Sequence, residues 1–131
     1  MGVAAPTPAD VAFAYLAALG AGDPGAVAAC VSEDFHNEHT SDRGTSTYGR
    51  DEYRRRLPGF LGEFTGLSYE VEDVVADGER VVVAYTMRAR WRDTHPIAIR
   101  GVMRLRVAGG HIAHRVDYWD GSAFLRQTGQ G

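Results

Sequence analysis

The segment GGHIAHRVDYWDGSAFL, residues 109–125, carries the pattern that decides the fold of this chain. Its two glycines predict a tight turn, and the run from His111 to Trp119 is rich in β-branched and aromatic residues, which predicts the last strand of a sheet. Asp117 lies among apolar and aromatic residues near the end of that strand. A carboxyl group in such surroundings is a candidate for acid/base catalysis.

Three more strands are predicted before this turn, at residues 67–76, 79–92 and 96–108. The short links between them predict a mostly antiparallel, four-stranded meander. Along the strand 79–92 apolar residues alternate with arginines, so one face of the sheet must be covered by helices. Glu70 and Glu72 can pair with the arginines of the other face. The apolar residues are Val81, Val83, Tyr85, Met87, Ala89 and Trp91.

Helices are predicted at residues 8–19, 25–31 and 51–64 from the spacing of apolar side chains. Asp23 is the expected N-cap of the second helix, and Pro58-Gly59 should kink the third. A short strand over 34–39 would place Asn37 and His39 on one face, with a polar loop at 40–47.

These elements predict an α+β domain in which three N-terminal helices pack on a curved, mostly antiparallel sheet. A single domain over residues 1–131 is expected, with 1–7 and 128–131 flexible. A curved sheet that helices do not fill completely leaves a pocket, which is the expected site of function.

Composition narrows the partners. The net charge of −3 gives no basic excess for binding nucleic acid. No apolar run approaches the roughly 20 residues that span a bilayer, and the first ten residues do not resemble a signal peptide, so we expect a cytoplasmic protein with no membrane partner. Cys30 is the only cysteine and is expected to be a small buried hydrophobe.

The segment Asp34-Phe35-His36-Asn37-Glu38-His39 and the closing segment 117–125 resemble the SnoaL-like polyketide cyclases. This family belongs to the nuclear-transport-factor-like superfamily, together with ketosteroid isomerases and limonene epoxide hydrolases. The resemblance extends over nearly the whole chain. It implies a cone-shaped α+β roll, a homodimer, and chemistry without a cofactor or metal.

Residues 14–23 are similar to the first helix and turn of the ketosteroid isomerases. This resemblance places Tyr15 where the isomerase has the tyrosine that donates to the enolate oxygen, and His39 where it has its aspartate base. The isomerase's third group, a protonated aspartic acid, has no counterpart near Gly101 and Met103. The chain therefore departs from a steroid isomerase.

Residues 48–51 and 115–120 are similar to segments of the limonene epoxide hydrolases. Asp117 matches one of the two catalytic aspartates of that enzyme. Its arginine and second aspartate belong on the strand of Tyr85 and Met87, where this chain has neither, and its water-positioning residues fall at Asn37 and His39. Epoxide hydrolysis is accordingly a further alternative.

The expected chemistry is proton removal next to a carbonyl group, in a cyclase, isomerase or dehydratase acting on a polyketide-like or other carbonyl-bearing molecule. Desolvation in an apolar pocket makes a carboxyl group usable as a base and then as an acid, so Asp117 is the predicted main acid/base. His39 is its partner or an alternative base, and Tyr15 the donor that polarises the oxygen. A flat, apolar or aromatic ligand is expected to contact Asn37, Phe60, Tyr85, Met87 and Trp119.

Other interpretations stay open. Tyr15 fits an ordinary core tyrosine at least as well as a catalytic one. Asp117 could form an ion pair with Arg115 and have no catalytic role. The pocket could bind a ligand without catalysing a reaction. The domain could also be an accessory domain whose sole role is dimerisation. His36 and His39 should point to opposite faces of their strand, which disfavours a shared metal ion, and His111 and His114 are expected at the surface or an interface. Asp120 is the expected N-cap of a helical turn at 121–126.

Overall fold

The first two helices begin where the sequence supplies capping groups. In the computed structural model, which describes residues 5–41 and 44–130, helix α1 is Pro8–Ala21 and helix α2 is Pro24–Ala29. The Thr7 side chain accepts from the Asp10 amide, and the Asp10 carboxylate accepts from the Thr7 amide. Asp23 caps α2 as predicted, but α2 ends before Val31, which already belongs to a strand.

The predicted meander is confirmed. Strands β3 (Phe64–Asp77), β4 (Arg80–Trp91), β5 (His95–Ala108) and β6 (His111–Trp119) pair in sequence order, each antiparallel to the next. The alternation along β4 sends its apolar side chains into the core and its arginines outward. On the outer face Arg88 pairs with Glu70, and Arg100 pairs with Glu72.

Two further strands extend this sheet beyond β6. Strand β1, Val31–His39, runs parallel to β6, and β2, Thr47–Tyr48, pairs antiparallel with β1. The strand order is β2-β1-β6-β5-β4-β3, so the four-stranded meander is part of a six-stranded sheet. The prediction of a loop through Thr47 was wrong at its end, because the Thr47 backbone pairs with Asn37.

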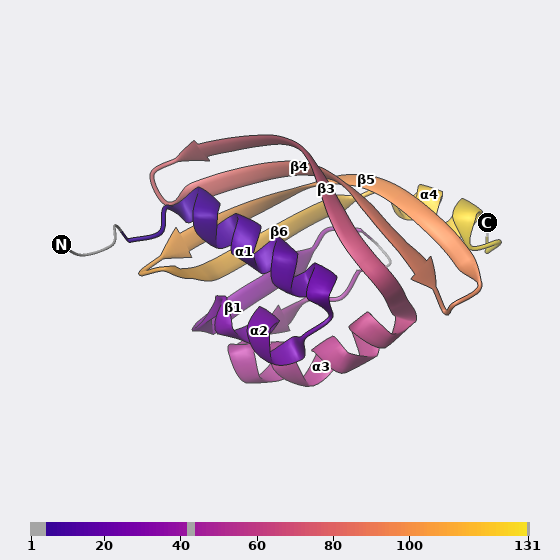
Figure 1. Cartoon of the computed structure of the whole chain (residues 1–131), viewed down its shortest axis with the longest axis horizontal. Helices are drawn as coiled ribbons and strands as arrows, with labels where there is room; N and C mark the ends of the chain where they lie inside the picture. The colour runs from indigo at the N-terminus through magenta and orange to yellow at the C-terminus, as the bar shows by residue number, and fades with distance from the viewer. Residues whose placement is uncertain (1–4, 42–43, 131) are drawn as a thin grey trace.

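Helices cover one side of the curved sheet (Figure 1). Helix α1 lies across strands β3 to β6, and α3, Arg50–Glu63, lies beyond α2. Pro58 lies inside α3, and the helix continues through it. The final helix, α4, is Gly121–Gln127 and is capped by Asp120 as predicted. The predicted α+β roll, with helices on a mostly antiparallel sheet, is confirmed.

The ends of the chain pack in different ways. Flexibility is predicted for residues 1–7 and 128–131. Of these, residues 1–4 and 131 lie outside the described residues, and for the others flexibility stays a prediction. The Thr128 side chain is buried and donates to the Phe124 carbonyl.

Cys30 is half-buried at the end of α2. Within residues 5–41 and 44–130, every helix is too short or too polar to cross a membrane.

Candidate active site

A cavity of about 500 Å³ opens between helices α3 and α4 and the concave side of the sheet. Its wall is largely aromatic, and Phe124 of α4 packs edge-on against both Trp91 and Trp119. His39, Arg115 and Asp117 supply polar groups to the same wall. The aromatic residues that line it are Phe60, Phe64, Tyr69, Tyr85, Trp91, Trp119 and Phe124. Such a cavity suits a flat apolar ligand that carries a few polar atoms.

Asp117 is 3 % exposed, as its apolar neighbours predicted, but it is not an isolated acid. Its Oδ2 accepts a hydrogen bond of 2.6 Å from Nη2 of Arg115, and its Oδ1 accepts one of 2.5 Å from the Tyr85 hydroxyl. Arg115 is itself 4 % exposed. The expected carboxyl group in apolar surroundings is therefore corrected to a buried ion pair with a tyrosine donor.

Tyr15 lies behind this ion pair and not in the cavity wall. Its ring is 0 % exposed, and its hydroxyl accepts from Nη1 of Arg115 at 2.7 Å and lies 2.5 Å from the Tyr53 hydroxyl. Among the described residues that line the cavity, Tyr15 does not occur. The predicted direct contact of Tyr15 with a substrate oxygen is thus corrected: Tyr15 orients Arg115.

His39 reaches Asp117 because β1 and β6 run parallel with these two residues in register. Nδ1 of His39 lies 3.9 Å from Oδ2 of Asp117, and Nε2 lies 3.3 Å from Nδ2 of Asn37. Burial lowers the pKa of His39 to about 4, with a further lowering by the positive charge of Arg115 and a smaller opposing effect of Asp117. The imidazole is therefore neutral at physiological pH.

Two tyrosines of the wall keep their protons. Burial raises the pKa of Tyr69 to about 12, and it raises the pKa of Tyr85 well above its usual range, with the negative charge of Asp117 adding to the effect. The two rings pack edge-on with their centroids 5.1 Å apart. Because the Tyr85 hydroxyl donates its single proton to Asp117, the Tyr69 hydroxyl is the donor available to a ligand.

The predicted ligand contacts divide between two spaces. Phe60, Tyr85, Met87 and Trp119 line the large cavity, whereas Asn37 lines an adjoining chamber of about 100 Å³, to which His39, Phe60 and Arg115 also contribute. Sequence reasoning missed Tyr69, Trp91 and Phe124 as lining residues. The alternation that places Tyr85 and Met87 inward also places Trp91 inward, so the sequence held a signal for Trp91.

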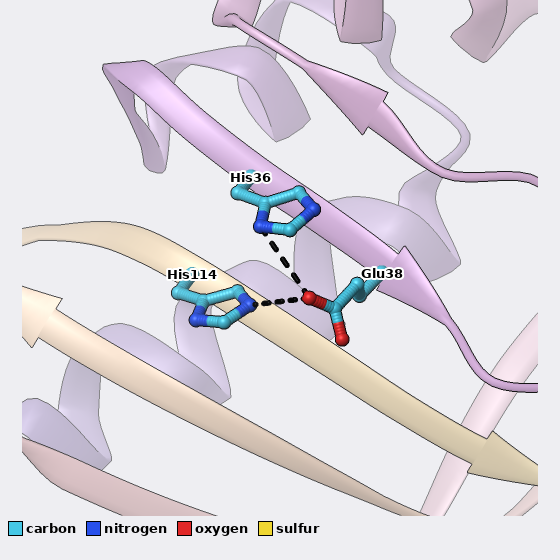
Figure 2. A group of neighbouring side chains, drawn as sticks. All are labelled: His36, Glu38 and His114. Atoms are coloured by element: carbon cyan, nitrogen blue, oxygen red, sulfur yellow. Dashed lines mark ion pairs between the residues drawn. The ribbon is translucent and has the colours of Figure 1, made fainter.

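One group of side chains has the ligand types of a metal site. His36 and Glu38 of β1 and His114 of β6 cluster on the sheet face opposite the cavity (Figure 2). His36 and His39 do point to opposite faces, as predicted, so His39 is not part of this cluster.

Comparison with known proteins identifies the family. The profile of the SnoaL-like domain matches residues 12–115. The chain belongs to the SnoaL-like domain family. This membership accounts for the resemblance of the segment 34–39. No protein of curated function matches the chain.

Solved structures share the SnoaL-like fold at low identity. A protein of Catenulispora acidiphila with a ketosteroid isomerase-like fold, in complex with trimethylamine, is 19% identical, with a TM-score of 0.84 over 98% of this chain and 96% of that one. A candidate SnoaL-like polyketide cyclase of Shewanella denitrificans is 19% identical, with a TM-score of 0.81 over 96% and 99%. An epoxide hydrolase of Mycobacterium tuberculosis, similar to limonene epoxide hydrolase, is 21% identical, with a TM-score of 0.80 over 92% and 91%.

Proposed function

We propose that this SnoaL-like domain is a cofactor-independent acid/base enzyme of the cyclase, isomerase or dehydratase type. Its substrate is a flat, largely apolar small molecule with a carbonyl group, of polyketide-like or similar character. The observation that carries the proposal is the pairing of His39 with Asp117 at the polar end of an aromatic cavity.

His39 is the base in this proposal, and Asp117 is its partner. A neutral imidazole can accept a proton from the carbon next to the carbonyl group. A pKa of about 4 makes His39 a weak base, comparable with the aspartate base of ketosteroid isomerase, whose pKa is about 4.6. The carboxylate of Asp117, 3.9 Å away, stabilises the imidazolium that forms.

The enolate oxygen needs a donor, and the cavity supplies the Tyr69 hydroxyl. Tyr69 keeps its proton and lines the same space as His39, whereas the proton of Tyr85 is already donated to Asp117. Preorganised donors in a site that excludes water stabilise developing negative charge more strongly than water does. Returning the proton to a different atom gives isomerisation, and attack of the carbanion on a second carbonyl group gives ring closure.

Hydrogen–deuterium exchange tests this step without knowledge of the natural substrate. The protein is incubated in D₂O with 2-tetralone, a flat bicyclic ketone, and loss of the proton signal next to the carbonyl group is followed by NMR. We expect accelerated exchange that falls by about 100-fold or more in His39→Gln. His111→Gln, a change at an exposed histidine of β6, should leave the exchange rate unchanged.

A binding module without chemistry is the second candidate, because both oxygens of Asp117 already accept hydrogen bonds. Saturable binding of 2-tetralone with no accelerated exchange would favour this alternative and refute the enzyme. Hydration of an epoxide probe such as styrene oxide, with no exchange on the ketone, would favour the epoxide hydrolase alternative instead.

A cytoplasmic location and a homodimer also belong to the proposal. Tyr118 and Val102 are neighbours in the register of β6 and β5 and are both exposed on the outer face of the sheet. An apolar patch of this kind supports burial against a second copy.

A further inference from the structure

The outer face of the β1–β6 pair gathers three side chains with metal-ligating atoms. His36 and His114 are register partners on parallel strands, and Glu38 follows two residues after His36 on the same face. Figure 2 shows the Glu38 carboxylate lying between the two imidazoles. Oε1 of Glu38 is 3.5 Å from Nδ1 of His36 and 3.4 Å from Nε2 of His114.

We propose that His36, Glu38 and His114 form a binding site for a divalent transition-metal ion, of which Zn²⁺ is the representative. Two imidazoles and one carboxylate are a common ligand set for Zn²⁺, with bond lengths of about 2.0–2.2 Å. Ligand atoms at the corners of a tetrahedron with such bonds are roughly 3.4 Å apart. The two distances from the Glu38 oxygen match this spacing, and three protein ligands leave a position for water.

The rings need one adjustment. His36 and His114 are stacked with their centroids 4.7 Å apart and their planes 9° apart, so their lone pairs lie in nearly parallel planes. One ring must turn about its Cβ–Cγ bond before both nitrogens face the same ion. Tyr48 stacks on the other side of His36, at 4.0 Å, and holds that ring. The ring of His114 is therefore the one that turns.

The surroundings of His114 favour this change. Its Nε2 atom is buried and lies 3.4 Å from Oε1 of Glu38, but it makes no hydrogen bond of good geometry to any residue within 5–41 and 44–130. A buried polar atom without a hydrogen bond gains free energy when it acquires a partner. Arg106, the register partner of His114 on β5, is exposed, so solvent screens its repulsion of a cation.

The ion would join the two strands that carry the candidate catalytic pair. His39 and Asp117 lie on the other face of β1 and β6, a few residues further along. Zn²⁺ should therefore raise the thermal stability of the domain through binding to the folded state alone. This consequence does not depend on whether the cavity is catalytic.

Calorimetry on the full chain, with any affinity tag removed and after treatment with a chelator, tests the proposal with ZnCl₂ as the probe. We expect one ion per chain and a rise in the melting temperature on addition of Zn²⁺. Glu38→Gln and His114→Ala should each weaken binding at least about tenfold and abolish that rise. His111→Ala, a change at another histidine of β6, is the matched control and should bind as the unchanged chain does.

NMR separates this site from adventitious binding to histidines. With Zn²⁺ we expect the ring signals of His36 and His114 to shift, while those of His39 and His95 do not. Absence of binding, or binding that survives both Glu38→Gln and His114→Ala, would overturn the proposal. Circular dichroism of each variant shows that a loss of binding is not a loss of folding.

Discussion

At the scale of single residues, Arg115 is the centre of the polar site. A buried ion pair is costly unless the remaining donors and acceptors are also bonded. Here Tyr85 donates to the second oxygen of Asp117 and the Tyr15 hydroxyl accepts from the second terminal nitrogen of Arg115, whereas the buried Nε of Arg115 has no hydrogen-bond partner among the described residues. The network fixes the carboxylate that faces His39, so Tyr15, which does not line the cavity, still positions the site.

His39 makes folding stability depend on pH. Its pKa is about 4 in the folded state and 6.5 when the side chain is fully solvated, so between these values the unfolded chain binds more protons than the folded chain. The free energy of unfolding therefore falls as the pH falls from 6.5 to 4, by up to about 3 kcal/mol from this residue. Above pH 6.5 the contribution is constant.

Urea unfolding of the unchanged chain and of His39→Gln, at several values between about pH 7 and pH 4, measures this contribution. The difference between the two curves removes the effect of the other histidines, which both proteins share. Parallel curves would mean that the folded state leaves the pKa of His39 at its ordinary value, and the argument for a neutral, buried imidazole would be wrong.

At the scale of elements, local sequence patterns predicted the helices and strands whose ends are set by nearby residues. Caps and turns, such as Asp23 and the glycines before His111, located the helices and the meander. The pairing of β1 with β6 joins segments that are far apart in the sequence, and no turn specifies it. The proximity of His39 to Asp117 and that of His36 to His114 both follow from this pairing. Sequence reasoning therefore selected His39 and Asp117 but could not place His114 beside His36.

The pairing of β4 with β5 depends on a glycine at one position. Gly101 is the register partner of Tyr85, and a Cβ atom on residue 101 would lie 2.5 Å from the Tyr85 hydroxyl and 2.7 Å from the Tyr118 carbonyl oxygen. Gly101→Ala must therefore displace Tyr85 from Asp117 or shift the backbone. We expect a loss of about 1–3 kcal/mol in the free energy of unfolding, measured with urea.

Gly62→Ala is the matched control for that substitution. Gly62 lies in α3, and a Cβ atom added to it would have nothing within 4 Å, so alanine should raise helix stability by up to about 1 kcal/mol. Equal effects of the two substitutions would show that the close approach of Tyr85 to residue 101 does not matter.

At the scale of the whole molecule, the cavity is assembled from segments that are far apart in the sequence. Helix α3 and strand β1 supply Phe60 and His39, and helix α4 supplies Phe124. The side chain of Gln127 donates to and accepts from the Ala98 backbone, which fixes α4 beside the start of β5. Sequence alternation could predict which residues of one strand face inward. It could not predict that α4 closes the cavity, because that contact depends on the curvature of the sheet.

Filling the cavity should abolish ligand binding without unfolding the domain. Met87 lines the cavity and is only half-buried, so the larger side chain of Met87→Trp can project into the open space instead of displacing the core. We expect the dissociation constant of 2-tetralone, measured by calorimetry, to rise at least about tenfold, because the added ring occupies the ligand volume. Val75→Trp places the same side chain at an exposed position of β3 and should leave the constant unchanged. An unaltered affinity in Met87→Trp would place the ligand outside this cavity, and the roles proposed for His39 and Tyr69 would then lose their physical basis.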